Sequence, residues 1–138
     1  MTVYDRHPEI GGLLTFGIPS FKLDKSLLAR RRKSSARWGF TSNSIVKWVK
    51  MSLWIRFWNN TTRSSSAYTY RSMKAGLPNE TRAGVDDALP FLIANTKQVM
   101  GLEELPEEPF INTAGLNVVV LGGGDTAMDC VRTAPRHG

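Results

Sequence analysis

Residues 117–127 read Asn-Val-Val-Val-Leu-Gly-Gly-Gly-Asp-Thr-Ala, and they are the strongest indication of fold class in the chain. The apolar, β-branched run at 117–121 predicts a buried strand, and residues 128–134 predict a helix that Pro135 ends. Strand, glycine turn and helix in this order form the context of a dinucleotide-binding fingerprint. The stretch therefore predicts an α/β protein with a Rossmann-like unit, although an ordinary tight turn has the same pattern.

The glycine turn has a physical reason for each of its small residues. Gly122 allows a tight turn, Gly124 allows the backbone to approach a pyrophosphate, and Ala127 allows close packing of helix against strand. The free N–H groups at the start of the helix would then face the phosphates. The strand whose end distinguishes NAD from NADP would follow residue 138, so the pattern leaves both open.

The rest of the chain predicts shorter elements. Residues 1–5 resemble the end of a strand, and residues 25–33 predict a basic helix. Asp86 or Asp87 suits the N-cap of another helix, and Gly101 lies where a helix commonly ends. The apolar residues of that helix fall near helical spacing at Leu89, Leu92, Ile93, Val99 and Met100. An acidic linker with two prolines follows at 103–109.

Composition excludes several classes of protein. The 138 residues contain one cysteine, Cys130, so the chain cannot form an internal disulfide or supply a Cys-only iron–sulfur site alone. No run approaches the roughly 18 apolar residues of a membrane span, and the first residues do not resemble a signal peptide. A cytoplasmic location is expected. We interpret Cys130 as a packing residue and His7 as a surface residue, and we expect no catalytic side chain and no metal site.

Several stretches together resemble one family. They are Asp5-Arg6-His7-Pro8-Glu9-Ile10-Gly11-Gly12-Leu13-Leu14, Phe16-Gly17-Ile18-Pro19, Phe21-Lys22-Leu23, the run Ala88-Leu89-Pro90-Phe91-Leu92-Ile93-Ala94-Asn95-Thr96-Lys97, and the run from Val119 to Cys130. They resemble the glutamate synthase small subunit and closely related NADPH-dependent oxidoreductases. The resemblance covers about residues 3–33 and 69–138, and it is more specific than the glycine turn alone.

The resemblance implies a division of the chain and a set of cofactors. Residues 1–33 would be a piece of an FAD-binding domain, 69–111 the remainder of that domain with a linker, and 112–138 the start of an NAD(P)H-binding domain. NADPH would reduce FAD, and iron–sulfur clusters would pass electrons onward to a large glutamate synthase subunit or another acceptor. The cysteine ligands of those clusters and the FAD glycine fingerprint do not occur in this chain.

The same resemblance implies individual site residues. Asp5 would bind the adenosine ribose of FAD, and Gly11, Gly12 and Leu13 would lie along the flavin. The pyrophosphate of NADPH would be held by Gly122, Gly124, Asp125, Thr126 and Ala127. Hydride transfer depends on aligned rings more than on a side-chain acid, so the lack of a catalytic set is no objection.

Residues 34–68 differ from both neighbouring regions. They hold five Lys or Arg residues, no acidic residue and all four tryptophans of the chain. Family members read there like Ile-Phe-Ser-Ala-Met-Gly. This peptide can be encoded by ATC TTC AGC GCG ATG GGG. When the first base is removed, the shifted codons encode Ser-Ser-Ala-Arg-Trp-Gly, which is the sequence of residues 34–39. We interpret 34–68 as translated out of frame.

Two expectations follow from this block. If it is out of frame, central strands of the FAD domain are lost, so the chain alone would fold poorly and bind neither cofactor well. If it is taken at face value, the chain is instead a small basic protein that associates with membranes or nucleic acid. The cations Lys47, Lys50 and Arg56 do not gather on one helical face, which argues against this alternative.

Overall fold

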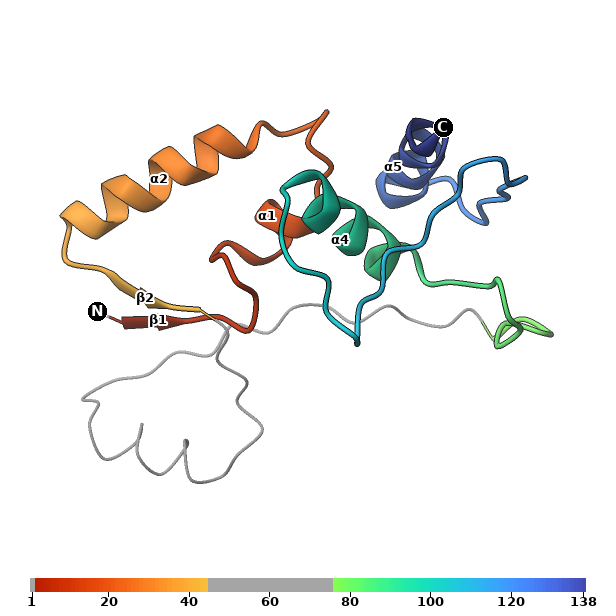
Figure 1. Ribbon diagram of the computed structural model, residues 1–138, viewed down its shortest axis with the longest axis horizontal. Helices are drawn as coiled ribbons and strands as arrows, with labels where there is room; N and C mark the ends of the chain where they lie inside the picture. Colours follow the sequence, from red (N-terminus) through yellow and green to blue (C-terminus); the bar gives the residue numbers. More distant parts are fainter. Residues whose placement is uncertain (1, 45–75) are drawn as a thin grey trace, which may run out of the picture.

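The computed structural model describes residues 2–44 and 76–138. Their elements are shown in Figure 1 and are, in chain order, β1 (Thr2–Tyr4), α1 (Gly12–Phe16), α2 (Lys25–Arg37), β2 (Thr41–Asn43), α4 (Ala88–Val99), α5 (Asp125–Thr133) and the 3-10 helix η1 (Ala134–His137). Most of the block at 34–68, including Lys47, Lys50 and Arg56, lies outside the described residues, so the alternative built on these cations stays a prediction.

Strands β1 and β2 form a two-stranded parallel sheet. Val3 pairs with Ser42 in its register, and Asp5 N–H extends the ladder to the Asn43 carbonyl at 3.0 Å. Parallel strands need a crossover, and here α2 makes it. The expected strand at 1–5 is confirmed, and the chain has the expected mixture of helix and parallel sheet.

Helix α2 is longer than predicted. The Asp24 side chain caps its start by accepting a hydrogen bond from Ser26 N–H at 2.9 Å. The helix runs past residue 33 because no glycine or proline interrupts it before Gly39, whose φ of 80° allows the terminal turn. It therefore continues into the anomalous block, and β2 also belongs to that block.

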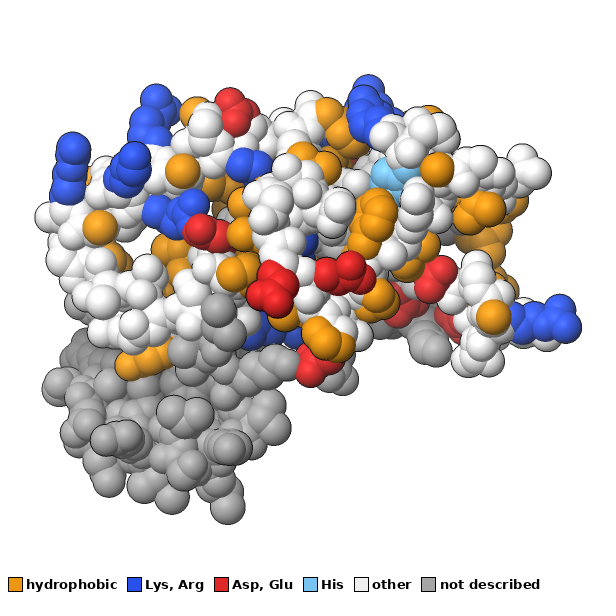
Figure 2. All heavy atoms as spheres, viewed as in Figure 1, with side chains coloured by type: hydrophobic (Ala, Val, Ile, Leu, Met, Phe, Trp, Pro, Cys, Tyr) orange, Lys and Arg blue, Asp and Glu red, His pale blue; other side chains and the backbone are white. Residues whose placement is uncertain are grey.

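No residue of α2 is buried. Its exposed cations give the molecule the basic edge seen at the upper left of Figure 2. These are Arg30, Arg31, Lys33 and Arg37. A helix without a buried face contributes little apolar packing to the fold.

The apolar core lies between α4 and α5. Phe91 and Leu92 from α4 pack with Cys130 from α5 and Ala134 from η1. Phe16 is also buried, on α1, which packs against α4. Cys130 is thus the packing residue that we expected.

Helix α4 begins after Asp87 and ends before Gly101, whose φ is 67°, as the pattern predicts.

The strand predicted at 117–121 is absent from the described structure, so that prediction was wrong for this chain. The backbone there forms no ladder, and the side chains of Val119 and Leu121 remain 83% and 79% exposed. A strand needs neighbouring backbone to satisfy its N–H and C=O groups. Within residues 2–44 and 76–138, the only strand pairing other than β1–β2 is the isolated bridge between Leu105 and Glu108.

The helix after the glycine turn starts earlier than predicted, at Asp125. It ends at Thr133, and the chain then tightens into η1 with Pro135 near its start. Proline lacks a backbone N–H and cannot continue an α-helix, so the predicted stop is confirmed. No helix in the described part of the chain is long and apolar enough to span a bilayer.

Candidate cofactor-binding site

The glycine turn leads directly into α5. Gly122 has a φ of 135°, and Gly124 is the N-cap residue of the helix. The N–H groups of Asp125, Thr126 and Ala127 have no partner inside the helix, because they belong to its first turn, and the N-cap residue Gly124 provides no side chain to cap them. A Cβ at Gly122 would lie 3.5 Å from the Ala127 Cβ, in ordinary contact, so it is the φ of 135° that favours glycine at this position.

The turn is open on its outer side. Cβ atoms at Gly123 and Gly124 would meet no heavy atom within 4 Å, and residues 122–126 are exposed. The start of α5 is therefore accessible, and exposed N–H groups at a helix start are the kind of donor to which phosphates bind. Asp125 places a carboxylate in the first turn of α5, where it stabilises the helix dipole but opposes an anion.

The second candidate segment follows β1. One carboxylate oxygen of Asp5 accepts the His7 N–H at 3.0 Å, which closes a tight turn after the strand. Gly11 and Gly12 have φ values of 120° and 51°, in the region that side chains rarely occupy. Thr15 Oγ1 donates to the Ile10 carbonyl at 2.9 Å and so fixes this double-glycine turn.

The two segments lie on different parts of the molecule. Helix α1 packs on α4, and α4 packs on α5, so that α4 stands between the double-glycine turn and the helix of the triple-glycine turn. Figure 1 shows β1 and α5 on opposite sides of α1 and α4. The structure thus keeps each predicted set together locally, and it separates the Asp5 set from the Gly122 set.

Ion pairs between distant segments connect these parts, and the sequence patterns did not identify them. Lys22 Nζ lies 3.0 Å from an Asp129 carboxylate oxygen on α5. Lys97 on α4 pairs with Glu108 in the linker, and Arg6 reaches the same carboxylate at 3.3 Å. These pairs join residues 11 to 107 positions apart, for which a local pattern gives no signal.

The electrostatics around Glu108 follow from this arrangement. Burial by itself raises the pKa of the Glu108 carboxyl, but the hydrogen bond and charge of Lys97, with His7 and Arg6, lower it overall. His7 is only 7% exposed, so our interpretation of it as a surface residue was wrong. Its ring lies 4.7 Å from the Phe16 ring, and burial and the Arg6 charge lower the pKa of its imidazole.

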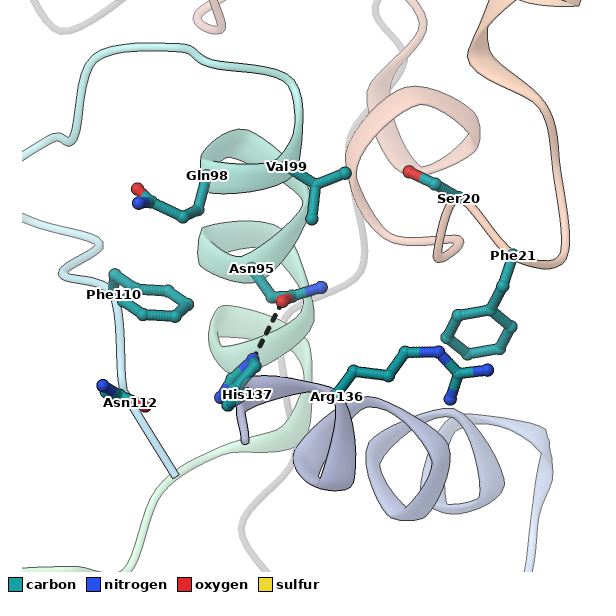
Figure 3. A pocket seen from close by; sticks show the side chains of 9 residues that line it. All are labelled: Ser20, Phe21, Asn95, Gln98, Val99, Phe110, Asn112, Arg136 and His137. Atoms are coloured by element: carbon teal, nitrogen blue, oxygen red, sulfur yellow. Dashed lines mark hydrogen bonds between the residues drawn. The ribbon is translucent and has the colours of Figure 1, made fainter. Parts of the chain in front are cut away.

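A cleft of about 430 Å³ lies between α4, the Ser20–Phe21 turn, the linker and η1. Figure 3 shows Asn95 reaching toward His137 and Arg136 lying along Phe21. Nine residues line the cleft: Ser20, Phe21, Asn95, Gln98, Val99, Phe110, Asn112, Arg136 and His137. None of the predicted site residues is among them.

No group of three or more His, Cys, Asp or Glu side chains is placed to hold a metal ion in the described ranges.

Comparison with curated proteins identifies the relatives of the chain. It is 72% identical over 141 residues to "Putative oxidoreductase AegA" of Escherichia coli strain K12, across 100% of the chain. It is 53% identical over 139 residues to "Glutamate synthase [NADPH] small chain" of the same strain, across 99% of the chain. By sequence, the chain is related to the glutamate synthase small chains.

The relationship extends over the whole chain but over a minor part of each relative. The chain spans 21% of the length of AegA and 29% of the E. coli glutamate synthase small chain. It is also 34% identical over 143 residues to the NADH glutamate synthase of Schizosaccharomyces pombe, of which it spans 7%. No family model matches the sequence. The family resemblance is confirmed, and the alignments run through residues 34–68 as well.

Proposed function

We propose that the chain is part of an NAD(P)H-dependent flavin oxidoreductase of the glutamate synthase small-chain type. The identity of 53% to the NADPH glutamate synthase small chain carries this proposal, because the alignment covers 99% of the chain and includes both glycine turns. When bound, FAD accepts a hydride from the nicotinamide and releases electrons one at a time. The onward acceptor would be an iron–sulfur protein region or a large glutamate synthase subunit, since the single Cys130 cannot ligate a cluster.

On the FAD side, Asp5 and the double-glycine turn would do the binding. The Asp5 carboxylate uses one oxygen on His7 N–H, so its other oxygen is available for a ribose hydroxyl. A Cβ at Gly12 would meet no atom within 4 Å, so the backbone at Gly12 and Leu13 is open to a flat ring. Leu13 is exposed, as a residue along a bound flavin would be without the cofactor.

On the NAD(P)H side, the start of α5 would hold the pyrophosphate. The N–H groups at 125–127 supply the donors, and Gly122 and Gly124 keep the approach free of side chains. The carboxylate of Asp125 would have to turn away from the phosphates. The side chains of this chain would therefore orient the nucleotide through backbone donors, and they would supply no acid or base.

We further propose that the chain by itself is catalytically inactive. Its described sheet has two strands, and the apolar segment 117–121 is unpaired, so neither nucleotide would be enclosed. The out-of-frame origin of residues 34–68 explains both features, because that block stands where sheet strands are expected. The continuation of α2 through residue 37 and the pairing of β2 show that the start of the block still adopts regular structure.

The first experiment is to resequence the genomic DNA across codons 34–68 and its flanks. An uninterrupted reading frame that encodes strand-like sequence at 34–68 would support the proposed oxidoreductase function, and the frame-corrected protein should bind FAD and oxidise NADPH. If the DNA contains the shifted frame, this would support the proposed inactivity, and the purified 138-residue chain should then lack flavin. Tight FAD binding by the chain with its present sequence would contradict its proposed inactivity.

A further inference from the structure

His137 connects three segments that are distant in the sequence. Its Nδ1 lies 3.1 Å from the Thr113 backbone nitrogen in the linker, and its Nε2 lies 2.9 Å from Asn95 Oδ1 on α4. The ring itself belongs to η1, directly after α5. The Phe91 and Phe110 rings lie 5.8 Å and 5.0 Å from it, so the imidazole has aromatic neighbours from both α4 and the linker. The Asn95 contact is drawn in Figure 3.

These contacts require one protonation state of the ring. A backbone N–H only donates, so Nδ1 must accept from Thr113, and the proton of the neutral ring must lie on Nε2, where it is donated to Asn95. The Thr113 hydroxyl is 2.8 Å from Nδ1 and donates to the Ala134 carbonyl at 3.0 Å. A second proton on Nδ1 would face the Thr113 N–H and leave this partly buried donor without an acceptor.

Burial and the nearest charged side chain favour the neutral ring, whereas its place in the last turn of η1 favours a cation through the helix dipole. Among the side chains that line the cleft, Arg136 is the only other one that carries or can gain a charge, and it opposes a second cation. The Arg136 guanidinium lies 4.2 Å from the centre of the Phe21 ring and donates to the Arg132 carbonyl. From α4 the ring meets Asn95 and Phe91, and from the linker it meets Phe110 and Thr113, all uncharged. Burial lowers the pKa of the imidazole.

We propose that His137 is a positioning residue that, as neutral imidazole, holds the linker and the end of α5 on α4 and releases them when it is protonated. The inference deepens the proposed function, because α4 belongs to the flavin segment and α5 begins at the nucleotide turn. Fixing α5 on α4 fixes the direction in which the glycine turn presents a bound nucleotide. Acidification would then weaken the packing of the linker and the end of α5 on α4, and it would leave the ion pair between Lys97 and Glu108 in place.

The test follows the two histidines of the 138-residue chain by NMR from pH 8 to pH 4.5, with His7→Gln to assign the His137 signal. We expect His137 to titrate below the ordinary value of about 6.5. As the pH falls below that pKa, the exchange protection of the Thr113 amide, corrected for the intrinsic rate, should fall by up to about tenfold per pH unit. In His137→Gln, an uncharged amide can still accept from Thr113 and donate to Asn95, so this pH dependence should disappear.

A His137 that titrates at its ordinary value overturns the proposal. So does Thr113 protection that does not change with pH, or that falls in His137→Gln as it does in the wild type. If His137→Gln fails to fold, the His137 titration and the Thr113 protection of the wild-type chain decide whether the proposal holds. NADPH and FAD titrations of the frame-corrected protein test the proposed function separately: failure of that protein to bind either cofactor, with His137 titrating as expected in the 138-residue chain, would count against the proposed function and not against this role of His137.

Discussion

Lys97 is a charged side chain that the fold buries almost completely, at 2% exposure. Its ammonium group pairs with Glu108, which also meets Arg6. Removal of one partner from a buried ion pair leaves a charge without compensation, which costs more than the pair itself contributes. The stability of this region at the scale of single residues therefore depends on both charges being present together.

We expect Lys97→Met to destabilise the chain by about 2–3 kcal/mol, somewhat less than a fully buried pair because Arg6 still reaches Glu108. Thermal unfolding of the purified chain measures this loss. The control is the double variant Lys97→Met with Glu108→Gln, which removes both charges and should recover at least half of the loss. Equal losses in the single and double variants would show that the charge of Glu108 is not responsible.

Gly11 and Gly12 form a matched pair at the double-glycine turn. Both have positive φ, but a Cβ at Gly11 would overlap Thr15 Oγ1, whereas a Cβ at Gly12 would meet nothing. We expect Gly11→Ala to cost about 1–3 kcal/mol and Gly12→Ala about 1 kcal/mol in unfolding free energy. Denaturant unfolding compares them. In the Gly11→Ala background, Thr15→Ala should recover part of the loss, and no recovery would contradict the proposed overlap.

At the scale of elements, the segment 117–121 has the composition of a strand but no pairing partner in the described structure. Its exposed apolar side chains and free backbone groups make it an edge on which another chain can add. Val120 is the exception, because it packs against the core of Phe91, Leu92, Cys130 and Ala134. The segment therefore has one side that supports the fold and one side that favours self-association.

We expect Val119→Lys to reduce self-association without loss of thermal stability, because the added charge lies on the exposed side. Light scattering over a concentration series measures the effect. Val120→Lys is the matched control: it places a charge against the apolar core and should lower the melting temperature. If both variants behave alike, the two sides of the segment are not distinct in solution.

The glycine turn before α5 provides the element-scale test of nucleotide binding. We expect Gly122→Val to weaken NADPH binding at least tenfold, because a branched side chain at a φ of 135° is strained and crowds Ala127. A fluorescence titration of NADPH with the frame-corrected protein measures this, because the 138-residue chain by itself is proposed to enclose neither nucleotide. Gly101→Val also places a branched residue at positive φ, away from the turn, and should lose stability but keep the binding. Equal losses of affinity would indicate general unfolding.

At the scale of the whole molecule, the described residues build a small core around α4 and α5, whereas α2 buries no residue and the sheet has two short strands. Small buried area gives a shallow dependence of stability on denaturant. We expect a broad unfolding transition, with the most protected amides in α4 and α5 and little protection in β1 and β2. Hydrogen exchange measures this directly, and uniform protection across all elements would contradict it.

His7 and His137 both contribute to the pH dependence of the whole molecule. Because folding lowers the pKa of each imidazole, the unfolded chain binds more protons below the ordinary value of about 6.5. The contribution of His137 to stability is therefore complete above that pH and is lost as the pH falls toward the folded pKa. The melting temperature should decline over this interval in the wild type and decline less in His137→Gln.

The sequence by itself determined the elements that depend on neighbours along the chain. The start of α4 after Asp87, the helix ends at Gly101 and Pro135, and the glycine turn before α5 were all predictable because turn and helix preferences are local. The resemblance to the glutamate synthase small chains was also predictable, because long runs such as residues 88–97 carry it. Only the tertiary structure decided that 117–121 stays unpaired, that His7 is buried, and that Lys97, Glu108 and His137 join distant segments. Pairing and burial depend on which segments meet in space, and no local pattern encodes that.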